Sequence, residues 1–283
     1  MLFGAHVSIS DGYIKALDYA ESVGCECIQV FAKSPRQWRG HAIDADAAAE
    51  FVSTRAQRGF GPVFTHTAYL INLATEDDGL RERSIAALAD ELARGGLLRA
   101  AGVVTHVGND PARDADAAAE RVAKAVRAAY DIAGQAAHGV RLLLENSAGA
   151  GTSFGCSFEE LGACIGLTGL PQECLGICLD TCHAFAYGMP VDSDEGWAGV
   201  VSTIERTCGL DRLGLIHAND CMFERGSKRD RHAWIGDGLI GREGFKAMVQ
   251  LPELAGVPAC TEMPGDPPEK DRTNIERLKS MRS

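Results

Sequence analysis

Short apolar runs alternate with helix-like segments along the whole chain, and this alternation constrains the fold more than any other feature. The runs are rich in branched residues, as are strands that are buried on both faces of a parallel sheet. We predict eight strands, near residues 2–7, 27–32, 62–66, 102–107, 140–145, 174–180, 213–218 and 257–262. Strands that alternate with helices indicate βα units and a parallel sheet.

The segments between these runs carry Ala, Leu, Glu and Arg at helical spacing. They lie at residues 11–24, 44–59, 78–101, 112–137, 157–166, 194–209, 241–251 and 267–281. Eight βα units in one chain favour a closed barrel over an open sheet, which leaves edge strands unpaired. Because no Pro- or Ser-rich linker interrupts the series, we predict an α/β fold with one domain, a TIM (β/α)8 barrel over residues 1–283.

Residues able to bind a metal lie at or just beyond the ends of six predicted strands, and two more lie in a later RDRH segment. The nine candidates are His66, His106, Glu145, Asp180, His183, His217, Asp230, His232 and Glu262. In a parallel barrel the loops after the strands share one face, so we expect these side chains to converge there. Glu145 ends a strongly apolar run, where a buried carboxylate would be costly without a cation.

Imidazole and carboxylate ligands in this number suit Zn²⁺, with Mn²⁺ as a second possibility at some sites. Nine ligands are too many for one tetrahedral ion, and a shared carboxylate would divide them among three ions. Ions a few ångströms apart suit phosphodiester hydrolysis, because they can stabilise both the attacking and the leaving oxygen. The sequence therefore favours a hydrolytic multinuclear site.

The net charge of −11 would by itself argue against a polyanionic partner. Three divalent ions would reduce it to about −5 and would concentrate positive charge at the site. Basic residues also gather in two predicted loops that could face a polyanion. One loop carries Lys33, Arg36 and Arg39, and the other carries Arg225, Lys228, Arg229 and Arg231.

The ten cysteines are expected to be reduced thiols that pack as small apolar groups. Cys182 is the exception of interest, because it lies between the candidate ligands Asp180 and His183. The sequence contains no apolar run long enough to span a membrane, and its first residues lack the pattern of a signal peptide. We therefore expect a soluble, cytoplasmic protein.

Long ordered motifs extend from the first residues to the last predicted strand. They are GAHVS, FAKSPRQW, HTAYLINL, LENSAGAG, LDTCHAFAYG, HANDC, RDRH and TEMP. With these motifs the chain resembles the endonuclease IV family of metal-dependent apurinic/apyrimidinic endonucleases over essentially its whole length. Pro35 and Thr67 depart from the usual family pattern but remove none of the candidate ligands.

The resemblance implies three zinc ions and assigns each ligand. The first ion would be held by His66, His106 and Glu145, the second by Glu145, Asp180, His217 and Glu262, and the third by His183, Asp230 and His232. Glu145 would then bridge two ions and be the central catalytic residue.

The resemblance also implies the reaction and the substrate. The enzyme would hydrolyse the phosphodiester 5′ to an abasic site in double-stranded DNA, leaving a 3′-hydroxyl and a 5′-deoxyribose phosphate. It could also clean blocked 3′ ends. Arg36, Tyr69 and Leu70 match the family's DNA-binding wedge, and their types suit stacking on bases and insertion between them. We expect the protein to act as a monomer in base excision repair.

Two other functions remain open at this stage. One is a divalent-metal sugar isomerase or epimerase with the same type of barrel, which needs fewer metals and neither the wedge motifs nor the ligands His183, Asp230 and His232. The other is a non-catalytic DNA-binding protein in which zinc is structural, although structural zinc sites are usually closed by four protein ligands.

Overall fold

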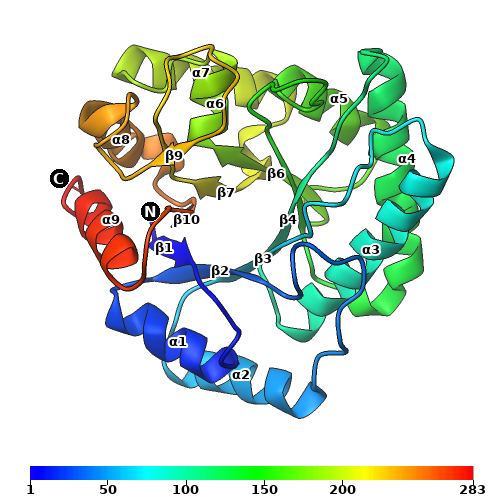
Figure 1. Ribbon diagram of the computed structural model, residues 1–283, viewed down its shortest axis with the longest axis horizontal. Coiled ribbons are helices and arrows are strands. Elements are labelled where there is room, and N and C mark those ends of the chain that lie inside the picture. Colours follow the sequence, from blue (N-terminus) through cyan, green and yellow to red (C-terminus); the bar gives the residue numbers. More distant parts are fainter. Residues whose placement is uncertain (283) are drawn as a thin grey trace.

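The computed structural model describes residues 1–282 and has a closed parallel barrel at its centre (Figure 1). Around the barrel the strands follow the order β1-β10-β7-β6-β5-β4-β3-β2. Their bounds are β1 Phe3–His6, β2 Cys27–Phe31, β3 Val63–His66, β4 Gly102–His106, β5 Leu142–Glu145, β6 Leu175–Asp180, β7 Leu213–His217 and β10 Ala259–Thr261. The predicted TIM barrel is thus confirmed. Ser283, the last residue of the predicted domain, lies outside the described residues.

The α-helices form a ring outside the barrel (Figure 1). Those found in residues 1–282 are α1 Tyr13–Ser22, α2 Ala45–Gln57, α3 Asp78–Leu97, α4 Ala115–Ala133, α5 Phe158–Thr168, α6 Thr181–Tyr187, α7 Asp194–Thr207, α8 Gly241–Gln250 and α9 Glu269–Lys279. Three short 3₁₀ helices span Gly134–Ala137, Leu210–Arg212 and Pro252–Leu254. None of the helices in the described chain is long and apolar enough to span a membrane.

One α-helix and one two-stranded sheet near the carboxyl ends of the barrel strands were not predicted from the sequence. Helix α6 begins directly after β6, where we expected a turn, because the side chain of Asp180 accepts the backbone N–H of His183 and caps the helix. Strands β8 (Asp220–Cys221) and β9 (His232–Ala233) pair antiparallel and close a loop between β7 and α8. Both elements place residues at the carboxyl ends of the barrel strands.

Polar caps explain why several helices begin where they do. Asp44, Asp77 and Asp114 each accept a backbone N–H in the first turn of α2, α3 and α4. Ser157 and Glu160 form a reciprocal capping box at the start of α5. Each such cap typically stabilises a helix by about 1 kcal/mol, so the sequence specifies these starting points locally.

The register of the barrel brings polar residues to one level. His106 on β4 is paired with Glu145 on β5, and Asp180 on β6 is paired with His217 on β7. Below this level the barrel interior is apolar, filled by Cys27, Phe64, Val104, Leu143, Cys178, Leu215 and Cys260. The polar side chains therefore lie directly above a closely packed apolar layer inside the barrel.

The cysteines agree with the prediction of reduced thiols. All ten lie in the described part of the chain as free thiols, and only Cys174 is not fully buried.

Candidate metal centre

The structure brings all nine candidate ligands to one end of the barrel. His66, His106, Glu145, Asp180 and His217 are the last residues of their strands, and Glu262 directly follows β10. His183 lies in α6, His232 begins β9, and Asp230 lies just before β9. They form three groups, within each of which one ligand atom per residue lies within 4.8 Å of the others. The groups are His66, His106 and Glu145; Glu145, Asp180, His217 and Glu262; and His183, Asp230 and His232.

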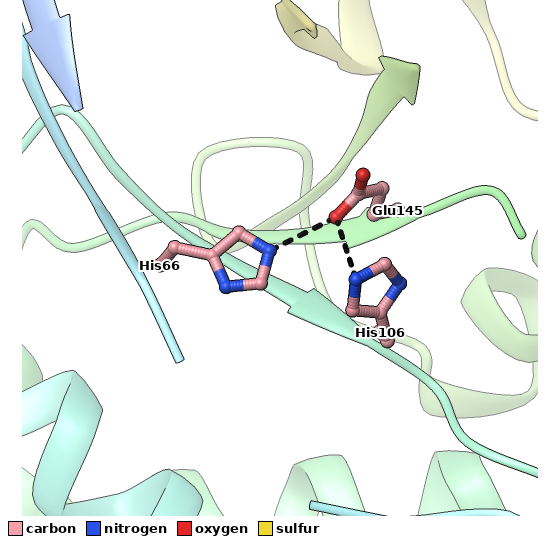
Figure 2. Close-up of side chains that lie close together, drawn as sticks. All are labelled: His66, His106 and Glu145. Atoms are coloured by element: carbon pink, nitrogen blue, oxygen red, sulfur yellow. Dashed lines mark hydrogen bonds and ion pairs between the residues drawn. The ribbon is translucent and has the colours of Figure 1, made fainter. Parts of the chain in front are cut away.

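Glu145 lies at the centre of the cluster. Its Oε2 lies 3.0 Å from Nε2 of His66 and 3.5 Å from Nε2 of His106. Figure 2 shows both imidazole rings turned toward this one oxygen. Its Oε1 faces the other way, 3.0 Å from Nδ1 of His217 and 3.5 Å from Nδ1 of His183. The carboxylate therefore presents one oxygen to each of two neighbouring groups, which is the geometry that a bridging ligand requires.

Three of the imidazoles are oriented by backbone carbonyl groups. Nδ1 of His66 lies 2.9 Å from the carbonyl oxygen of Thr67, and Nδ1 of His183 lies 2.9 Å from that of Asn146. Nδ1 of His232 likewise lies 2.8 Å from the carbonyl oxygen of Glu262. A carbonyl can only accept, so each ring in its neutral form carries its hydrogen on Nδ1 and has its lone pair on Nε2, directed toward the cluster.

His217 is oriented the opposite way by a side chain that the sequence analysis did not identify. Its Nε2 lies 2.9 Å from Oε1 of Gln29, and its Nδ1 faces Glu145. The amide nitrogen of Gln29 donates to Oε1 of Glu262 across 2.8 Å. The signal in the sequence was a glutamine in the middle of the apolar run CIQVF, and the structure shows this glutamine to be fully buried.

Two buried asparagines orient Asp180 and were also missed. Asn219 donates from Nδ2 to Oδ2 of Asp180 across 2.6 Å, and its Oδ1 accepts the backbone N–H of Glu262. Asn146 accepts the backbone N–H of Asp180 and donates to its carbonyl oxygen. Both follow a candidate ligand closely, in LEN and HAN, so their positions beside the cluster could have been predicted.

The residues present fit divalent cations. Nε2 of His232 is buried and has no hydrogen-bond partner within residues 1–282, yet it lies 3.2 Å from Oδ1 of Asp230 and 3.8 Å from Oδ2 of Asp180. Buried carboxylates that face imidazole lone pairs need a cation between them, because neither group can donate to the other when both are unprotonated.

Without a cation, the histidines and carboxylates of the cluster shift each other's pKa values. Burial alone would raise the pKa of Glu145, but the imidazoles of His106 and His217 hold that pKa well below its usual range. Conversely, burial alone would lower the pKa of His183, whereas the carboxylates of Asp180 and Asp230 raise it well above the usual histidine value. In the metal-free protein, protonated imidazoles therefore balance the charge of the carboxylates. A bound metal ion would replace these protons and balance the same charge.

Cys182 does not stand out as a ligand. Its sulfur lies within 4.8 Å of ligand atoms of Asp180 and His232. A hydrogen bond with Cys221 and burial both raise the pKa of the Cys182 thiol strongly. Because a thiolate and not a thiol binds metals, the histidines and carboxylates are the better donors.

The predicted wedge residues lie in two adjacent loops beside the first group. Tyr69 is 60% exposed, Arg36 is exposed and Leu70 is half-buried. The backbone N–H of Tyr69 donates to the carbonyl of Pro35 across 3.0 Å, which joins the two loops directly. The Tyr69 ring lies 5.9 Å from that of His66, measured between ring centroids, so these loops border the candidate ligands.

The two basic loops differ from each other in the structure. Arg225, Lys228, Arg229 and Arg231 are all exposed, as expected of a surface that could meet a polyanion. In the other loop Arg36 and Arg39 reach solvent, but the Lys33 side chain is only 1% exposed and pairs with Asp90. Grouping Lys33 with the exposed basic residues was therefore wrong, because its long side chain turns inward to a carboxylate on α3.

Comparison with known proteins identifies close relatives along the full chain. Residues 17–281 match the family described as xylose isomerase-like TIM barrel. Probable endonuclease 4 of Chloroflexus aurantiacus is 41% identical over 99% of this chain and 97% of its own length. Probable endonuclease 4 of Methanoculleus marisnigri is 38% identical over 99% of both.

Solved structures show the same relationship. Endonuclease IV from Thermus thermophilus superposes with a TM-score of 0.86 at 36% identity, covering 99% of this chain and 98% of that one. D-Psicose 3-epimerase from Clostridium cellulolyticum superposes with a TM-score of 0.65 at 16% identity, covering 100% of this chain and 96% of that one. At this identity the epimerase shares the fold alone.

Proposed function

Because this chain belongs to the endonuclease IV family of xylose isomerase-like TIM barrels and is therefore a nuclease of the hydrolase class, we propose that it incises double-stranded DNA at abasic sites. The cut would fall on the 5′ side of the abasic nucleotide and leave a 3′-hydroxyl and a 5′-deoxyribose phosphate. The same site could remove blocking groups from 3′ ends. The observation that carries the proposal is the convergence of three donor groups around Glu145, beside loops suited to DNA.

The donor groups would hold three zinc ions. His66, His106 and Glu145 would bind the first, Glu145, Asp180, His217 and Glu262 the second, and His183, Asp230 and His232 the third. Imidazole and carboxylate donors suit zinc, and manganese could replace it at some positions. When bound, such ions would polarise the scissile phosphodiester and stabilise the charge on the attacking and leaving oxygens.

The chain's own residues would prepare this site in advance. Glu145 would hold two groups at a constant separation through its two oxygens. Gln29 and Asn219 would keep His217 and Asp180 in their orientations, because each makes a short hydrogen bond to its ligand. Ligands that do not need to rearrange can stabilise a transition state at no cost in reorganisation.

The exposed loops would select the abasic site. Arg36 and Tyr69 offer planar groups that could stack on bases, and the half-buried Leu70 offers an apolar wedge. A nucleotide without a base is the easiest to turn out of the duplex, since little stacking is lost. We therefore propose that these three residues support the bent duplex while the sugar-phosphate reaches the metals.

The remaining proposals concern the protein as a whole. Residues 1–283 would act as a single domain and as a monomer, and the enzyme would work in the cytoplasm in base excision repair.

Incision of a duplex that carries one abasic-site analogue tests the proposal. The unaltered protein should cut the strand on the 5′ side of the analogue and leave an undamaged duplex intact. Glu145→Gln should reduce the rate at least about 100-fold, as expected on losing a group that acts on the transition state. Glu243→Gln, an exposed position on α8, is the control and should retain the rate.

Absence of incision would contradict the proposal, provided that the metal sites are filled. An uncut abasic strand with three ions bound per chain would refute the proposed activity. Epimerisation of a ketose by the same preparation would then favour the sugar-epimerase alternative, which shares the barrel.

A further inference from the structure

A largely buried ion cluster lies beneath the two loops that carry Arg36 and Tyr69. It consists of Lys33, from the loop after β2, and three residues of α3, which are Asp90, Glu91 and Arg94. The side chains of Lys33 and Glu91 are each only 1% exposed. None of these four residues belongs to the donor groups described above.

Lys33 attaches the first loop to α3. Its ammonium lies 2.8 Å from Oδ2 of Asp90 and 3.4 Å from Oε1 of Glu91. The same ammonium donates to the carbonyl oxygen of Trp38 across 3.3 Å, so it also bridges the two ends of the segment that contains Arg36. Arg94 adds a second attachment, donating to the carbonyl oxygen of Ala32 across 3.3 Å.

Glu91 attaches the second loop, which carries Tyr69, to the same part of α3. Its Oε1, which faces Lys33, also accepts the backbone N–H of Ala68 across 3.3 Å. Ala68 immediately precedes Tyr69, whose own N–H donates to Pro35 in the first loop. One carboxylate oxygen is therefore shared by the lysine of one loop and the backbone of the other.

Stability alone does not explain this pair. Burying two charges costs solvation, and well-packed apolar residues of similar size often stabilise a protein as well or better. Oε2 of Glu91 is buried without a hydrogen-bond partner in the described chain, so the carboxylate is not fully compensated. What the charged groups provide, and apolar ones could not, is a directional link between two loops.

We propose that Lys33 and Glu91 are a positioning pair that holds Arg36 and Tyr69 in their relative positions before DNA binds. This inference rests on the proposed function, because it assigns the two loops to the recognition of damaged DNA. A protein whose binding-competent arrangement is already populated binds more tightly than one that must first order its loops. The pair would therefore act on DNA affinity and leave the metal centre unchanged.

Three variants test the pair, namely Lys33→Met, Glu91→Gln and the double variant. The double variant is needed because Lys33→Met alone leaves the buried carboxylate of Glu91 without its cation, which could unfold the protein. Lys124→Met is the matched control, since Lys124 forms a 3.0 Å pair with Glu120 on the exposed face of α4.

Two measurements distinguish positioning from general support. In the absence of DNA, cleavage by trypsin after Arg36 and Arg39 should become at least about tenfold faster in the three variants, because looser loops open more often. For abasic duplex, KM should rise about tenfold while kcat at saturation and the bound metal stay within about threefold. Lys124→Met should match the unaltered protein in every measurement.

Variants with unchanged trypsin resistance and unchanged KM would overturn the inference. So would a loss of bound metal or of kcat in the folded double variant, because the pair would then support the barrel itself. If the unaltered protein does not cut abasic DNA, the proposed function fails instead, and the trypsin comparison alone decides whether the pair holds the loops.

Discussion

His217 donates the hydrogen on Nε2 to Oε1 of Gln29 across 2.9 Å, and this bond decides which of its nitrogens faces the candidate metal centre. Because an amide oxygen can only accept, the neutral ring carries its hydrogen on Nε2 and has its lone pair on Nδ1, which faces Glu145. The two residues lie on β7 and β2, far apart in the sequence.

Gln29→Leu should therefore weaken metal binding at the group that contains His217. Leucine has a similar volume but accepts no hydrogen bond, and loss of such a partner typically lowers metal affinity about 10- to 100-fold. Metal content after dialysis against a graded series of chelator concentrations measures the effect. Gln57→Leu, on the surface of α2, is the control, and an equal loss in both variants would contradict the assigned role.

Tyr69→Ala should weaken binding of abasic DNA far more than it changes metal content. Stacking of an aromatic side chain on a base is worth about 1–3 kcal/mol, which corresponds to roughly a 5- to 150-fold change in Kd. Tyr69 is 60% exposed and belongs to none of the donor groups. Fluorescence anisotropy of labelled duplex and elemental analysis provide the two measurements.

The control for Tyr69 is Ile132→Ala, which removes a 64% exposed apolar side chain from α4. It should leave both measurements unchanged. A parallel fall in DNA binding and metal content for Tyr69→Ala would mean that the ring supports His66, whose imidazole it approaches, and does not act on the DNA.

Asp220→Asn should destabilise the loop that carries Asp230 and His232. The buried carboxylate of Asp220 accepts backbone N–H groups from Cys221, Gly236, Gly238, Ile240 and Gly241. An amide would turn a donor toward some of these donors, at a cost of about 2–4 kcal/mol in the free energy of unfolding.

The metal count separates a local effect of Asp220→Asn from a global one. We expect a lower Tm and loss of the ion held by His183, Asp230 and His232, with the other two retained. Asp237→Asn, an exposed position in the same loop, should retain all three ions. Loss of every ion from a folded Asp220→Asn variant would show that the loop does not act on one group alone.

The metal-free protein should lose stability as the pH rises from about 6.5 to about 9. Burial alone would lower the pKa of His232, but Asp230, Asp180 and Glu262 raise it to about 9. A histidine whose pKa is raised by folding stabilises the fold fully below its unfolded pKa of about 6.5, and this contribution disappears as the pH passes the folded value. A metal must displace the same protons, so zinc affinity should increase over this interval.

Thermal melts of the metal-free protein and competition with a chromophoric chelator measure these opposite trends. His232→Gln removes one of the titrating groups and should flatten both. A metal-free Tm that rises between pH 6.5 and pH 9 would contradict the proton sharing inferred for His232.

Much of the fold follows from local properties of the sequence. The eight barrel strands lie within the predicted runs, because buried strands and amphipathic helices have different periodicities that can be recognised in short windows. Helix α6 and the β8–β9 pair were missed, since each is short and depends on contacts made by the loop in which it lies.

Seven of the nine candidate ligands could be identified from the sequence because residues at or just beyond the carboxyl ends of parallel strands must meet at one face of a barrel. That rule depends on topology and requires no side-chain detail. The other two, Asp230 and His232, were identified from the RDRH segment. The structure accordingly places these residues within three compact groups.

Only the tertiary structure decided how these groups are supported. The partnership of Gln29 with His217, and of Lys33 with Glu91, joins segments whose register depends on the closed barrel and on the packing of α3 beneath the loops. A hydrogen bond needs its two atoms within about 3.2 Å, and sequence spacing does not determine distances at that scale between remote segments. The sequence alone thus determined the barrel and which candidate ligands meet at one end of it, whereas the fold decided which nitrogen of His217 faces the other candidate ligands and which lysine is buried.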